Sequence, residues 1–402
     1  MRLRRGEGPP IRLLTAVPIC DGHDSAINTL NLEFIRHGIE VIYLGYHRSA
    51  RDIVRAAIQE GARAIGISSY NGGHVEFFAE MLARLKQQGA SSIGVFGGGG
   101  GTITPDDAAR MKGRGVDEIF FAGTPLPGMV EWVKRTYRSP ARSRARGDSP
   151  DRQLAQLLSS VESDRRLIKS QITNRKSQIT IGITGPGGAG KTTLIDELVL
   201  RFLKAHPDGR LAILSHDPSV LGHGALLGDR ASMIYSQDDR VFMRSLATRG
   251  RAGGLSVATE TCLRVLKQSA FDLVLVETVG IGQEALPFGR SLVDKTVLVM
   301  SPDYGSRLQL QKIVMLDRAD LVVVNKSDLP GARTAAVEVE QRLVANRRGK
   351  KISPSPPSKP LPSPGEVAER GVEGGERQRI VSTTAKRHRD PGVDALFREL
   401  MS

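Results

Sequence analysis

Short apolar runs alternate with longer amphipathic stretches along the first third of the chain. Five of these runs have the length of buried strands: 11–17, 41–44, 64–67, 93–96 and 118–121. The stretches between them show helical spacing, for example at 50–59 and 77–88. Strands that alternate with helices predict a parallel sheet with right-handed crossovers. We therefore expect residues 9–136 to form a doubly wound, Rossmann-like α/β domain.

The same alternation returns in the second half of the chain. An apolar run at 179–183 leads into a glycine-rich loop. Later runs of strand length follow at 211–214, 273–276, 296–300 and 321–324. This order predicts a second doubly wound parallel-sheet domain over residues 179–402.

Two segments interrupt the alternation. Residues 137–178 are basic and contain Pro and Ser, and the sequence Lys-Ser-Gln-Ile-Thr occurs at 169–173 and again at 176–180. Two copies are too few for a coiled coil, so we predict a low-complexity linker. Residues 349–377 are rich in Pro, Ser and Gly. Such a segment cannot bury enough apolar surface to fold, which predicts a disordered insertion.

The net charge of +14 raises nucleic acid as a partner, but its distribution argues against one. Residues 131–180 carry 12 Lys/Arg against 5 Asp/Glu, and residues 346–380 carry 8 against 4, so most of the charge lies in the linker and the insertion. Six Tyr and one Trp in the whole chain offer little for base stacking. We therefore expect no nucleic-acid partner.

The sequence predicts neither a targeting segment nor a membrane segment. Apolar runs stay well below the length of a transmembrane helix, and the basic start 1–5 continues into Gly and Pro. We expect a cytoplasmic protein without membrane contact. Cys20 and Cys262 lie far apart, which predicts buried thiols and neither a disulfide nor a zinc site.

The glycine-rich loop carries a strong chemical signal. Residues 185–192 read Gly-Pro-Gly-Gly-Ala-Gly-Lys-Thr and match G-x-x-x-x-G-K-[ST] between a strand and a helix. Backbone N–H groups can converge there on a phosphate, Lys191 can neutralise phosphate oxygens, and the Thr192 hydroxyl is a Mg²⁺ ligand. We predict Lys191 and Thr192 as catalytic residues. The predicted nucleotide contacts in this loop are Gly185, Gly187, Gly188, Ala189, Gly190, Lys191, Thr192 and Thr193.

A second motif favours guanine over adenine. Asn325-Lys326-Ser327-Asp328 follows the apolar run 321–324, where a base-binding loop belongs in a G domain. The Asp328 carboxylate can accept the two N–H donors that guanine presents together, and adenine offers no such pair. Asn325 and Lys326 complete this predicted contact set. Ser382–Lys386, with Ala385, is the predicted last guanine-contacting loop.

An acidic residue ends the run 273–276. Glu277 precedes Gly280 by three residues, in the place of the usual D-x-x-G. We predict that Glu277 is catalytic and reaches Mg²⁺ through water, and that the Gly280 amide senses the terminal phosphate. Gln283 stands three residues after Gly280 rather than directly after it, which predicts slow hydrolysis that depends on a partner.

These motifs, together with segments 214–219, 224–230, 242–249 and 277–283, resemble the metallochaperone-type GTPases that serve adenosylcobalamin-dependent acyl-CoA mutases. The resemblance covers nearly all of 179–345 and resumes at 380–398. It implies a Mg²⁺ site formed by Thr192, Asp217, Asp229, Glu277 and Thr278. The fused relatives have an arginine three residues after the Gly-Asp aspartate, where this chain has Ser232. We expect Arg230 to take over that nucleotide contact.

The first domain carries a second resemblance. Asp21-Gly22-His23 follows the first predicted strand, at the sheet edge where ligands bind. Its spacing to Ser68-Ser69-Tyr70 and to Gly97-Gly98 resembles the cobalamin-binding signature D-x-H-x-x-G, S-x-L, G-G, with Ala26 in place of the glycine and Tyr70 in place of the leucine. By this resemblance His23 ligates cobalt and Asp21 orients it. The implied cobalamin contacts are Asp21, His23, Ser68, Tyr70, Gly97 and Gly98.

Asn71-Gly72-Gly73-His74 is also similar to the fused isobutyryl-CoA mutases, which continue into a mutase barrel. This chain has no room for a barrel of about 250 residues. We expect a GTPase that gates loading or protection of adenosylcobalamin, using Mg²⁺ and GTP, for a separate acyl-CoA mutase subunit. An adenosyltransferase is a candidate partner, and a homodimer is expected. Two alternatives stay open: the cobalamin-carrying subunit of a split mutase, and a nonfunctional truncated fused mutase.

Overall fold

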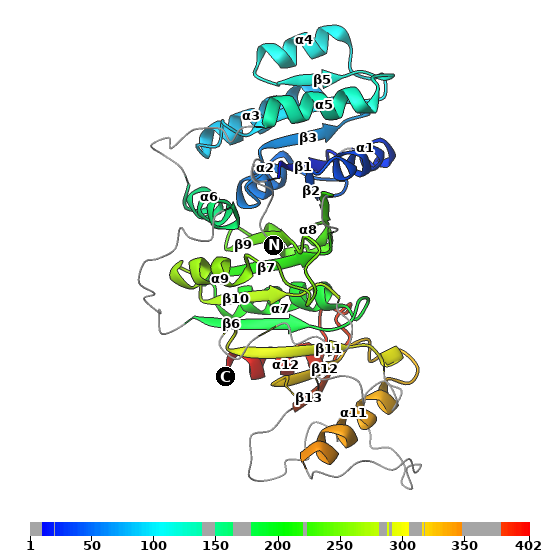
Figure 1. Ribbon diagram of the computed structural model, residues 1–402, viewed down its shortest axis with the longest axis vertical. Coiled ribbons are helices and arrows are strands. Elements are labelled where there is room, and N and C mark those ends of the chain that lie inside the picture. Colours follow the sequence, from blue (N-terminus) through cyan, green and yellow to red (C-terminus); the bar gives the residue numbers. More distant parts are fainter. Residues whose placement is uncertain are drawn as a thin grey trace. The chain divides into compact units, whose positions relative to one another are not determined.

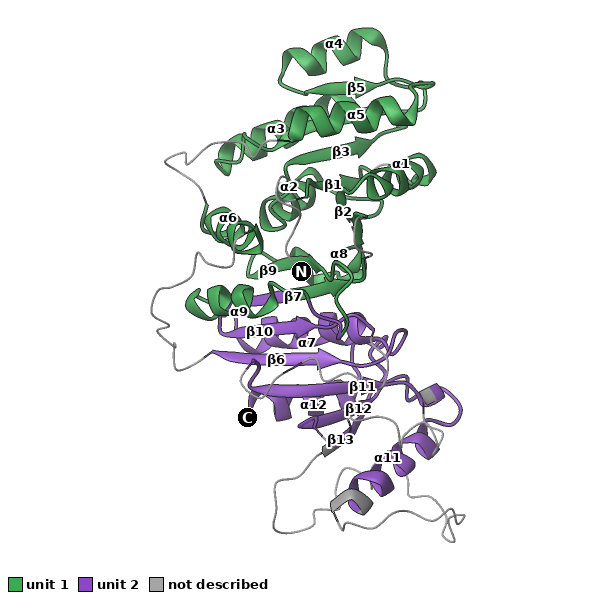
Figure 2. Ribbon diagram, in the orientation of Figure 1, with its two compact units in different colours: residues 1–175, 214–252, 256–270 green, residues 176–213, 253–255, 271–402 purple. Residues whose placement is uncertain are grey.

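A computed structural model divides into two compact units, which Figure 2 colours separately. Unit 1 comprises Met1–Arg175, Leu214–Ala252 and Ser256–Ala270, and unit 2 comprises Lys176–Ile213, Gly253–Leu255 and Phe271–Ser402. The structure describes residues 10–19, 21–138, 149–163, 178–219, 223–280, 288, 292–304, 316, 318–347 and 379–402. Several predicted features lie outside the described residues: the insertion 349–377, Cys20 and Gln283. The sequence repeat also lies outside them, apart from its last three positions, 178–180.

The sheet of unit 1 is parallel throughout and has the order β5-β4-β3-β1-β2-β8. Its strands are β1 (Arg12–Ala16), β2 (Glu40–Tyr43), β3 (Ala64–Ser68), β4 (Gly94–Gly98), β5 (Glu118–Phe120) and β8 (Ala225–Leu227). The first five coincide with the predicted apolar runs. The sixth comes from a segment that the sequence pattern assigned to the second domain.

Helices cover this sheet, as the crossovers between parallel strands require (Figure 1). They are α1 (Ser25–Arg36), α2 (Ala50–Gln59), α3 (His74–Gln87), α4 (Pro105–Gly113) and α5 (Leu126–Tyr137). The Ser49 side chain caps α2 by accepting the Asp52 N–H at 3.1 Å, and Thr104 caps α4 in the same way. Three further helices of unit 1 are α6 (Pro150–Ser163), α8 (Asp229–Ser232) and α9 (Thr259–Gln268).

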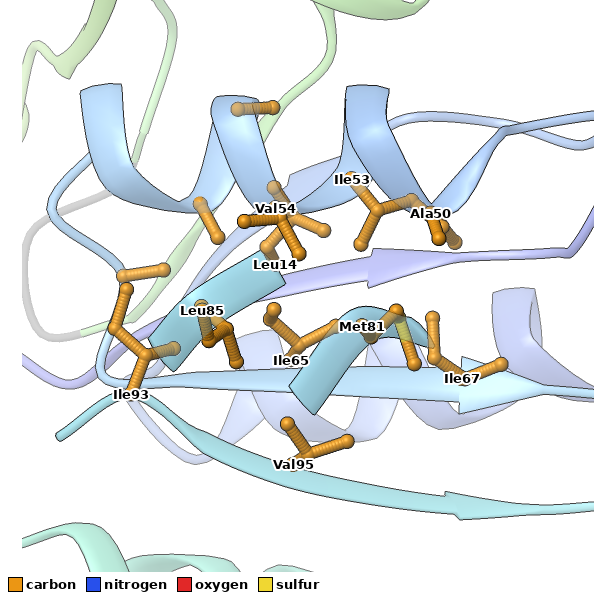
Figure 3. Close-up of a cluster of buried hydrophobic side chains, with 14 of the residues drawn as sticks. Leu14, Ala50, Ile53, Val54, Ile65, Ile67, Met81, Leu85, Ile93 and Val95 are labelled. Carbon is orange, nitrogen blue, oxygen red and sulfur yellow. The ribbon is translucent and has the colours of Figure 1, made fainter. Parts of the chain in front are cut away.

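One core cluster of unit 1 fills the space between the sheet and α2 and α3. Figure 3 shows its side chains from strands and helices converging: Leu14, Ala50, Ile53, Val54, Ile65, Ile67, Met81, Leu85, Ile93 and Val95. Ala225 and Leu227 of β8 belong to the same buried cluster. The apolar alternation along the chain therefore becomes one packed layer, and burial is its main source of stability.

The linker prediction differs from the structure over α6. Pro150–Ser163 is a helix, and the side chains of Arg152, Ala155, Leu158 and Val161 are buried. Their spacing of about three residues puts them on one helical face. The basic, serine-containing composition of the predicted linker hid this face, because only three of its four buried positions are apolar and they give a weak signal.

The second sheet has the order β13-β12-β11-β6-β10-β7-β9. Its strands are β6 (Ile179–Thr184), β7 (Leu211–Asp217), β9 (Val241–Ala247), β10 (Leu273–Glu277), β11 (Lys295–Met300), β12 (Leu321–Val324) and β13 (Arg379–Ser382). Of these strands, β9 and the end of β7 belong to unit 1. The described helices of unit 2 are α7 (Lys191–Ala205), α11 (Ala332–Arg347) and α12 (Pro391–Met401), with a short 3₁₀ turn at Pro302–Tyr304.

The predicted fold class, two parallel-sheet α/β domains, is confirmed. Within the described part of the chain, helices are too short or too polar to cross a membrane. Cys262 is buried on α9, as predicted.

Candidate functional site

The loop between β6 and α7 is shaped by glycines. Gly185, Gly188 and Gly190 have φ values of 142°, 75° and 87°, a region that side chains rarely adopt. A Cβ atom on Gly185 would also lie 2.0 Å from the carbonyl oxygen of Val299. Gly187, Gly188 and Thr193 are exposed. The loop therefore presents its backbone at the N-terminus of a 15-residue helix, where N–H groups attract anions.

Lys191 and Thr192 begin this helix and face polar groups. The Lys191 Nζ atom donates to the carbonyl oxygens of Gly185 and Pro186, both at 3.1 Å, although the residue is only 6% exposed. The Thr192 hydroxyl donates to Glu277 Oε1 at 2.8 Å. Two oxygens that could bind a metal ion, from Thr192 and Glu277, therefore lie with the Lys191 ammonium group at the phosphate-binding end of α7.

Glu277 ends β10 and is 3% exposed. The next residue, Thr278, donates its hydroxyl to Thr184 Oγ1 at 3.0 Å. A Cβ atom on Gly280 would lie 2.5 Å from Gly187 Cα, so a side chain there would push against the phosphate loop. The glycine after Glu277 is thus required by the close approach of two loops.

Asn325 joins three loops of unit 2. Its Nδ2 donates to the Ala189 carbonyl oxygen at 2.9 Å, and its Oδ1 accepts from Thr383 Oγ1 at 3.0 Å and from the Ala385 N–H at 3.1 Å. The adjacent Lys326 adopts a positive φ of 59°. The structure therefore brings the predicted base-binding motif, the phosphate loop and the Ser382–Lys386 loop together.

Asp328 pairs with Lys386, whose Nζ lies 2.5 Å from Asp328 Oδ2. The hydrogen bond from Lys386 lowers the pKa of this carboxyl group below its ordinary value. The side chain is accordingly ionised and remains an acceptor at neutral pH.

Two other predicted metal ligands lie in unit 1. Asp217 ends β7, and its Oδ1 accepts the Gly228 N–H at 3.5 Å. Asp229 is the first residue of α8, and its carboxylate accepts the Ser215 hydroxyl. Thr192, Glu277 and Thr278 belong to unit 2. Among the described residues, His, Cys, Asp and Glu side chains do not gather in groups of three or more that could hold a metal ion.

The prediction for Arg230 is wrong. Its side chain has no exposed surface and pairs with Glu60 at 3.1 Å. It also donates to Gln59 Oε1 at 3.0 Å and to the Met243 carbonyl oxygen at 2.6 Å. A guanidinium group enclosed in this way cannot reach a nucleotide. Ser232, the position of the arginine in the fused relatives, ends α8.

The loop after β1 arranges Asp21 and His23. The carboxylate of Asp21 is buried, and its Oδ1 accepts both the backbone N–H of His23 at 3.0 Å and the ring Nδ1–H at 2.9 Å. Its other oxygen accepts the Tyr70 N–H. Burial by itself would raise the pKa of Asp21, but the donors from His23 and Tyr70 lower it overall. In the neutral imidazole, an ionised Asp21 favours the tautomer with the proton on Nδ1, which puts the lone pair on Nε2, and the His23 side chain is 69% exposed.

Tyr70 packs beside this pair. Its ring centroid lies 5.6 Å from that of His23, and a Cβ atom on Gly100 would lie 2.0 Å from Tyr70 Cε1. Gly100 therefore packs against the predicted site residue Tyr70, a contact that the sequence analysis did not predict. The signal was present, because glycine continues without a break from Gly97 to Gly101. Ala26 is exposed in the first turn of α1.

Close packing inside unit 1 leaves no space for side chains at Gly97 and Gly98. A Cβ atom on Gly97 would lie 2.5 Å from Phe78 Cζ, and one on Gly98 would lie 2.6 Å from the Phe120 carbonyl oxygen. Ser68 ends β3 next to them and is 7% exposed. The contacts at the Cβ positions of these glycines are therefore internal packing contacts.

Fold and site together define a P-loop nucleotide-binding protein joined to a second Rossmann-like domain with a histidine loop at its ligand-binding edge. The B12 binding domain model matches residues 11–127, and the model of the methylmalonyl-CoA mutase-associated GTPase MeaB matches residues 154–400. The chain belongs to the MeaB GTPase family and carries a cobalamin-binding domain in front of the GTPase.

Related proteins share this combination. The fused isobutyryl-CoA mutase of Cupriavidus metallidurans is 37% identical over 414 residues, which cover 99% of this chain and 36% of that protein. The fused isobutyryl-CoA mutase of Geobacillus kaustophilus is 36% identical over 418 residues, covering 96% of this chain and 36% of its own length. The chain thus spans 36% of the length of these curated relatives. A solved LAO/AO transport system kinase is 20% identical, with a TM-score of 0.40, and the match covers 62% of this chain and 68% of the kinase.

Proposed function

We propose that this GTPase is a chaperone that gates the loading or protection of adenosylcobalamin on an acyl-CoA mutase of the methylmalonyl-CoA or isobutyryl-CoA type. The observation that carries the proposal is the Asp21–His23 pair, in a chain that also has the P-loop and the Asn325-centred base loop. A cofactor module and a nucleotide module in one chain allow nucleotide turnover to control cofactor delivery. By the family resemblance, an adenosyltransferase is the proposed cofactor donor and a homodimer the proposed assembly.

The residues of unit 1 fit a corrinoid. Metal-bound histidines usually donate their other ring N–H to a carboxylate, and the Asp21–His23 hydrogen bond at 2.9 Å has this form. His23 would hold cobalt through Nε2, with Tyr70 beside it and Ser68, Gly97 and Gly98 at the same sheet edge. Adenosylcobalamin, when bound, supplies a cobalt–carbon bond that can start radical chemistry.

The residues of unit 2 fit a Mg²⁺–GTP complex. Mg²⁺ prefers oxygen ligands, and the Thr192 hydroxyl and the Glu277 carboxylate lie 2.8 Å apart. Lys191 would exchange its two carbonyl acceptors for phosphate oxygens, and Asp328 would accept the guanine N–H pair. Asp217, Asp229 and Thr278 are the remaining proposed Mg²⁺ residues.

A second function is favoured by the relatives. Two fused isobutyryl-CoA mutases match almost the full length of this chain. In this alternative the chain is the cobalamin-carrying subunit of a split mutase, and its GTPase is regulatory. Both functions require His23, but they differ in when it is needed. A subunit contributes cobalamin at every turnover, whereas a chaperone can be removed after loading.

The test begins with the purified chain and hydroxocobalamin. Bound corrinoid should give a shifted visible spectrum that is lost in His23→Ala, and GTP hydrolysis should be lost in Lys191→Ala. An acyl-CoA mutase barrel subunit is then loaded in the presence of the chain and GTP and separated from the chain. Activity that survives separation supports the chaperone, and activity that requires the chain supports the split mutase. Absence of both corrinoid binding and GTP turnover would refute both functions.

A further inference from the structure

A cavity of about 1410 Å³ lies at the amino-terminal edge of the unit 1 sheet. Arg12 and Gly94, which begin β1 and β4, and Arg63, which precedes β3, line it together with residues of α3, α5 and α6. All of the lining residues belong to unit 1. His23 follows the carboxyl end of β1, so this amino-edge cavity is separate from the proposed cobalamin site. Ligand pockets usually measure about 300–1,000 Å³, so there is room for a small organic molecule.

Cationic side chains dominate the wall of the amino-edge cavity. Among the described residues, seven cationic side chains line it against two carboxylates, Asp117 and Glu162. Six of the cations are arginines, and the seventh is Lys86. A concave surface with an excess of one sign of charge concentrates ions of the opposite sign. The lining therefore favours an anionic ligand.

Both carboxylates accept hydrogen bonds from the protein itself. Glu162 accepts Arg12 Nη1 at 3.4 Å and Arg244 Nε at 3.1 Å. Burial alone would raise the pKa of Glu162, but Arg244 and Arg12 lower it overall. Asp117 accepts the Tyr137 hydroxyl at 2.7 Å. The two acids are thus engaged by neighbouring donors, and the cationic excess of the wall remains for a bound anion.

Two arginines are held in place at this wall. Arg152, on α6, is 5% exposed, and its Nη2 donates to the Ser92 hydroxyl at 2.7 Å. Arg63 Nη1 donates to the carbonyl oxygens of Tyr137 at 2.9 Å and Arg138 at 2.6 Å. Burial lowers the pKa of Arg63 below its ordinary value. These guanidinium groups are fixed by neutral oxygens before a ligand arrives, which reduces the entropy lost when they bind an anion.

Hydroxyl groups and apolar side chains complete the lining. Ser92 and the α6 residues Ser159, Ser160 and Ser163 add hydroxyl donors. A phosphate monoester carries a charge of about −2 and has three acceptor oxygens, so it can use more of these donors than a carboxylate can. Leu82 of α3 contributes partly buried apolar surface, beside the core cluster of Figure 3. The lining thus combines phosphate donors with an apolar wall.

We propose that the amino-edge cavity binds a small organic phosphate, with its phosphate group on Arg63 and Arg152 and its apolar group against Leu82. The site uses neither the phosphate loop nor the His23 loop, so it goes beyond the proposed function. Strand ends, α3 and α6 all contribute to the wall. A ligand that binds only the folded state should therefore stabilise unit 1 against unfolding.

The test titrates the full chain with n-hexyl phosphate by calorimetry, in Mg²⁺ and saturating GDP to occupy the phosphate loop. Hexyl phosphate should bind at least about tenfold more tightly than inorganic phosphate, because its chain buries apolar surface. It should also bind more tightly than hexanoate, whose head group has fewer acceptors. Lys191→Ala should bind hexyl phosphate like wild type, and the ligand should raise the Tm of both proteins.

A matched pair of variants locates the site. Ser160→Glu puts a carboxylate at an exposed lining position of α6, where like-charge repulsion should weaken hexyl phosphate binding by more than about tenfold. Gln153→Glu makes a similar charge change at an exposed position of the same helix, outside the described lining, and should bind like wild type. Both positions are exposed, so the Tm of each variant without ligand should stay close to that of wild type.

Each contrary result has a definite meaning. Equal affinity of Ser160→Glu and Gln153→Glu, or no binding of hexyl phosphate to the wild type, overturns the site. Loss of binding in Lys191→Ala places the phosphate in the nucleotide loop and also overturns it. Inorganic phosphate that binds as tightly as hexyl phosphate overturns the ligand class. None of these results bears on GTP hydrolysis or corrinoid binding, and the site would stand even if both of those activities were absent.

Discussion

Asp21 accepts two hydrogen bonds from His23, one from its backbone N–H at 3.0 Å and one from its ring at 2.9 Å. The carboxylate thereby fixes both the loop and the orientation of the imidazole. The role of Asp21 can therefore be tested by measuring how well His23 binds cobalt.

We expect Asp21→Ala to weaken cobalamin binding by about 10- to 100-fold, because a ligand histidine without its carboxylate partner loses orientation. His23→Ala should in addition eliminate the coupling of a protein nitrogen to Co(II) in electron paramagnetic resonance. Glu76→Ala, an exposed acid in the first turn of α3, serves as the control and should bind like wild type. A Co(II) spectrum unchanged by His23→Ala would mean that cobalt takes its ligand elsewhere.

Nucleotide preference should follow Asp328. The Lys386 hydrogen bond lowers its pKa, so the carboxylate is charged at neutral pH and accepts both guanine donors. Asp328→Asn should therefore lower kcat/KM for GTP and raise it for xanthosine triphosphate, which presents an acceptor where guanine presents an amine. The comparison of GTP, ATP and xanthosine triphosphate turnover in both proteins decides the point. Equal turnover of ATP and GTP by the wild type would show that the base loop is misassigned.

Glu60 is the predicted weak point of unit 1. It accepts Arg230 Nε at 3.1 Å, Arg12 at 3.1 Å and the Ser245 N–H at 2.9 Å, with no exposed surface. Glu60→Gln should lower the free energy of unfolding by about 3–5 kcal/mol, since a buried guanidinium loses its counter-charge. Glu260→Gln removes an exposed pair with Arg264 and should change it by less than about 1 kcal/mol. Urea titration of both variants measures the difference, and a Glu60→Gln midpoint equal to that of the control would contradict the prediction.

Cys262 should be inert in the folded chain. Burial, with a further contribution from Glu162, raises the pKa of its thiol to about 12, compared with about 8.5 for an unperturbed cysteine. The unfolded thiol therefore loses its proton first, and stability present below about pH 8.5 declines as pH rises toward 12. In a Cys20→Ser background, a thiol reagent at pH 8 should label Cys262 only after denaturant is added. Rapid labelling of the native chain would show that α9 opens readily.

Local pattern predicted much of the fold. The predicted helix 50–59 has the bounds of α2, and the apolar runs became strands, because amphipathic spacing and burial act within a few residues. The P-loop and base-loop motifs lie at strand ends because each directly follows an apolar run that forms a strand. Nothing in a local pattern specifies which sheet a three-residue strand such as β8 will join. That choice depends on the approach of Gly224 to Ile39 across the fold.

Arg230 illustrates the same limit at the site. An arginine next to a Gly-Asp turn suggests a phosphate contact by proximity in sequence. Its partner, Glu60, lies 170 residues away and was an unremarkable helix-end acid in the sequence. Long-range pairing of this kind comes from the tertiary structure alone, as does the position of Tyr70 against Gly100.

The sixth strand also bears on how such a chain can evolve. Two modules joined by a linker could be exchanged by recombination at the linker, each keeping its own core. Here an exchanged cobalamin module would have to bring acids at the positions of Glu40 and Glu60 and a free strand edge for Ala225–Leu227. A foreign module without them would leave arginines such as Arg230 buried without a counter-charge. The cobalamin-binding region and the GTPase region are therefore expected to evolve together. A substitution at Glu40 or Glu60 should restrict the substitutions accepted at Arg249 or Arg230.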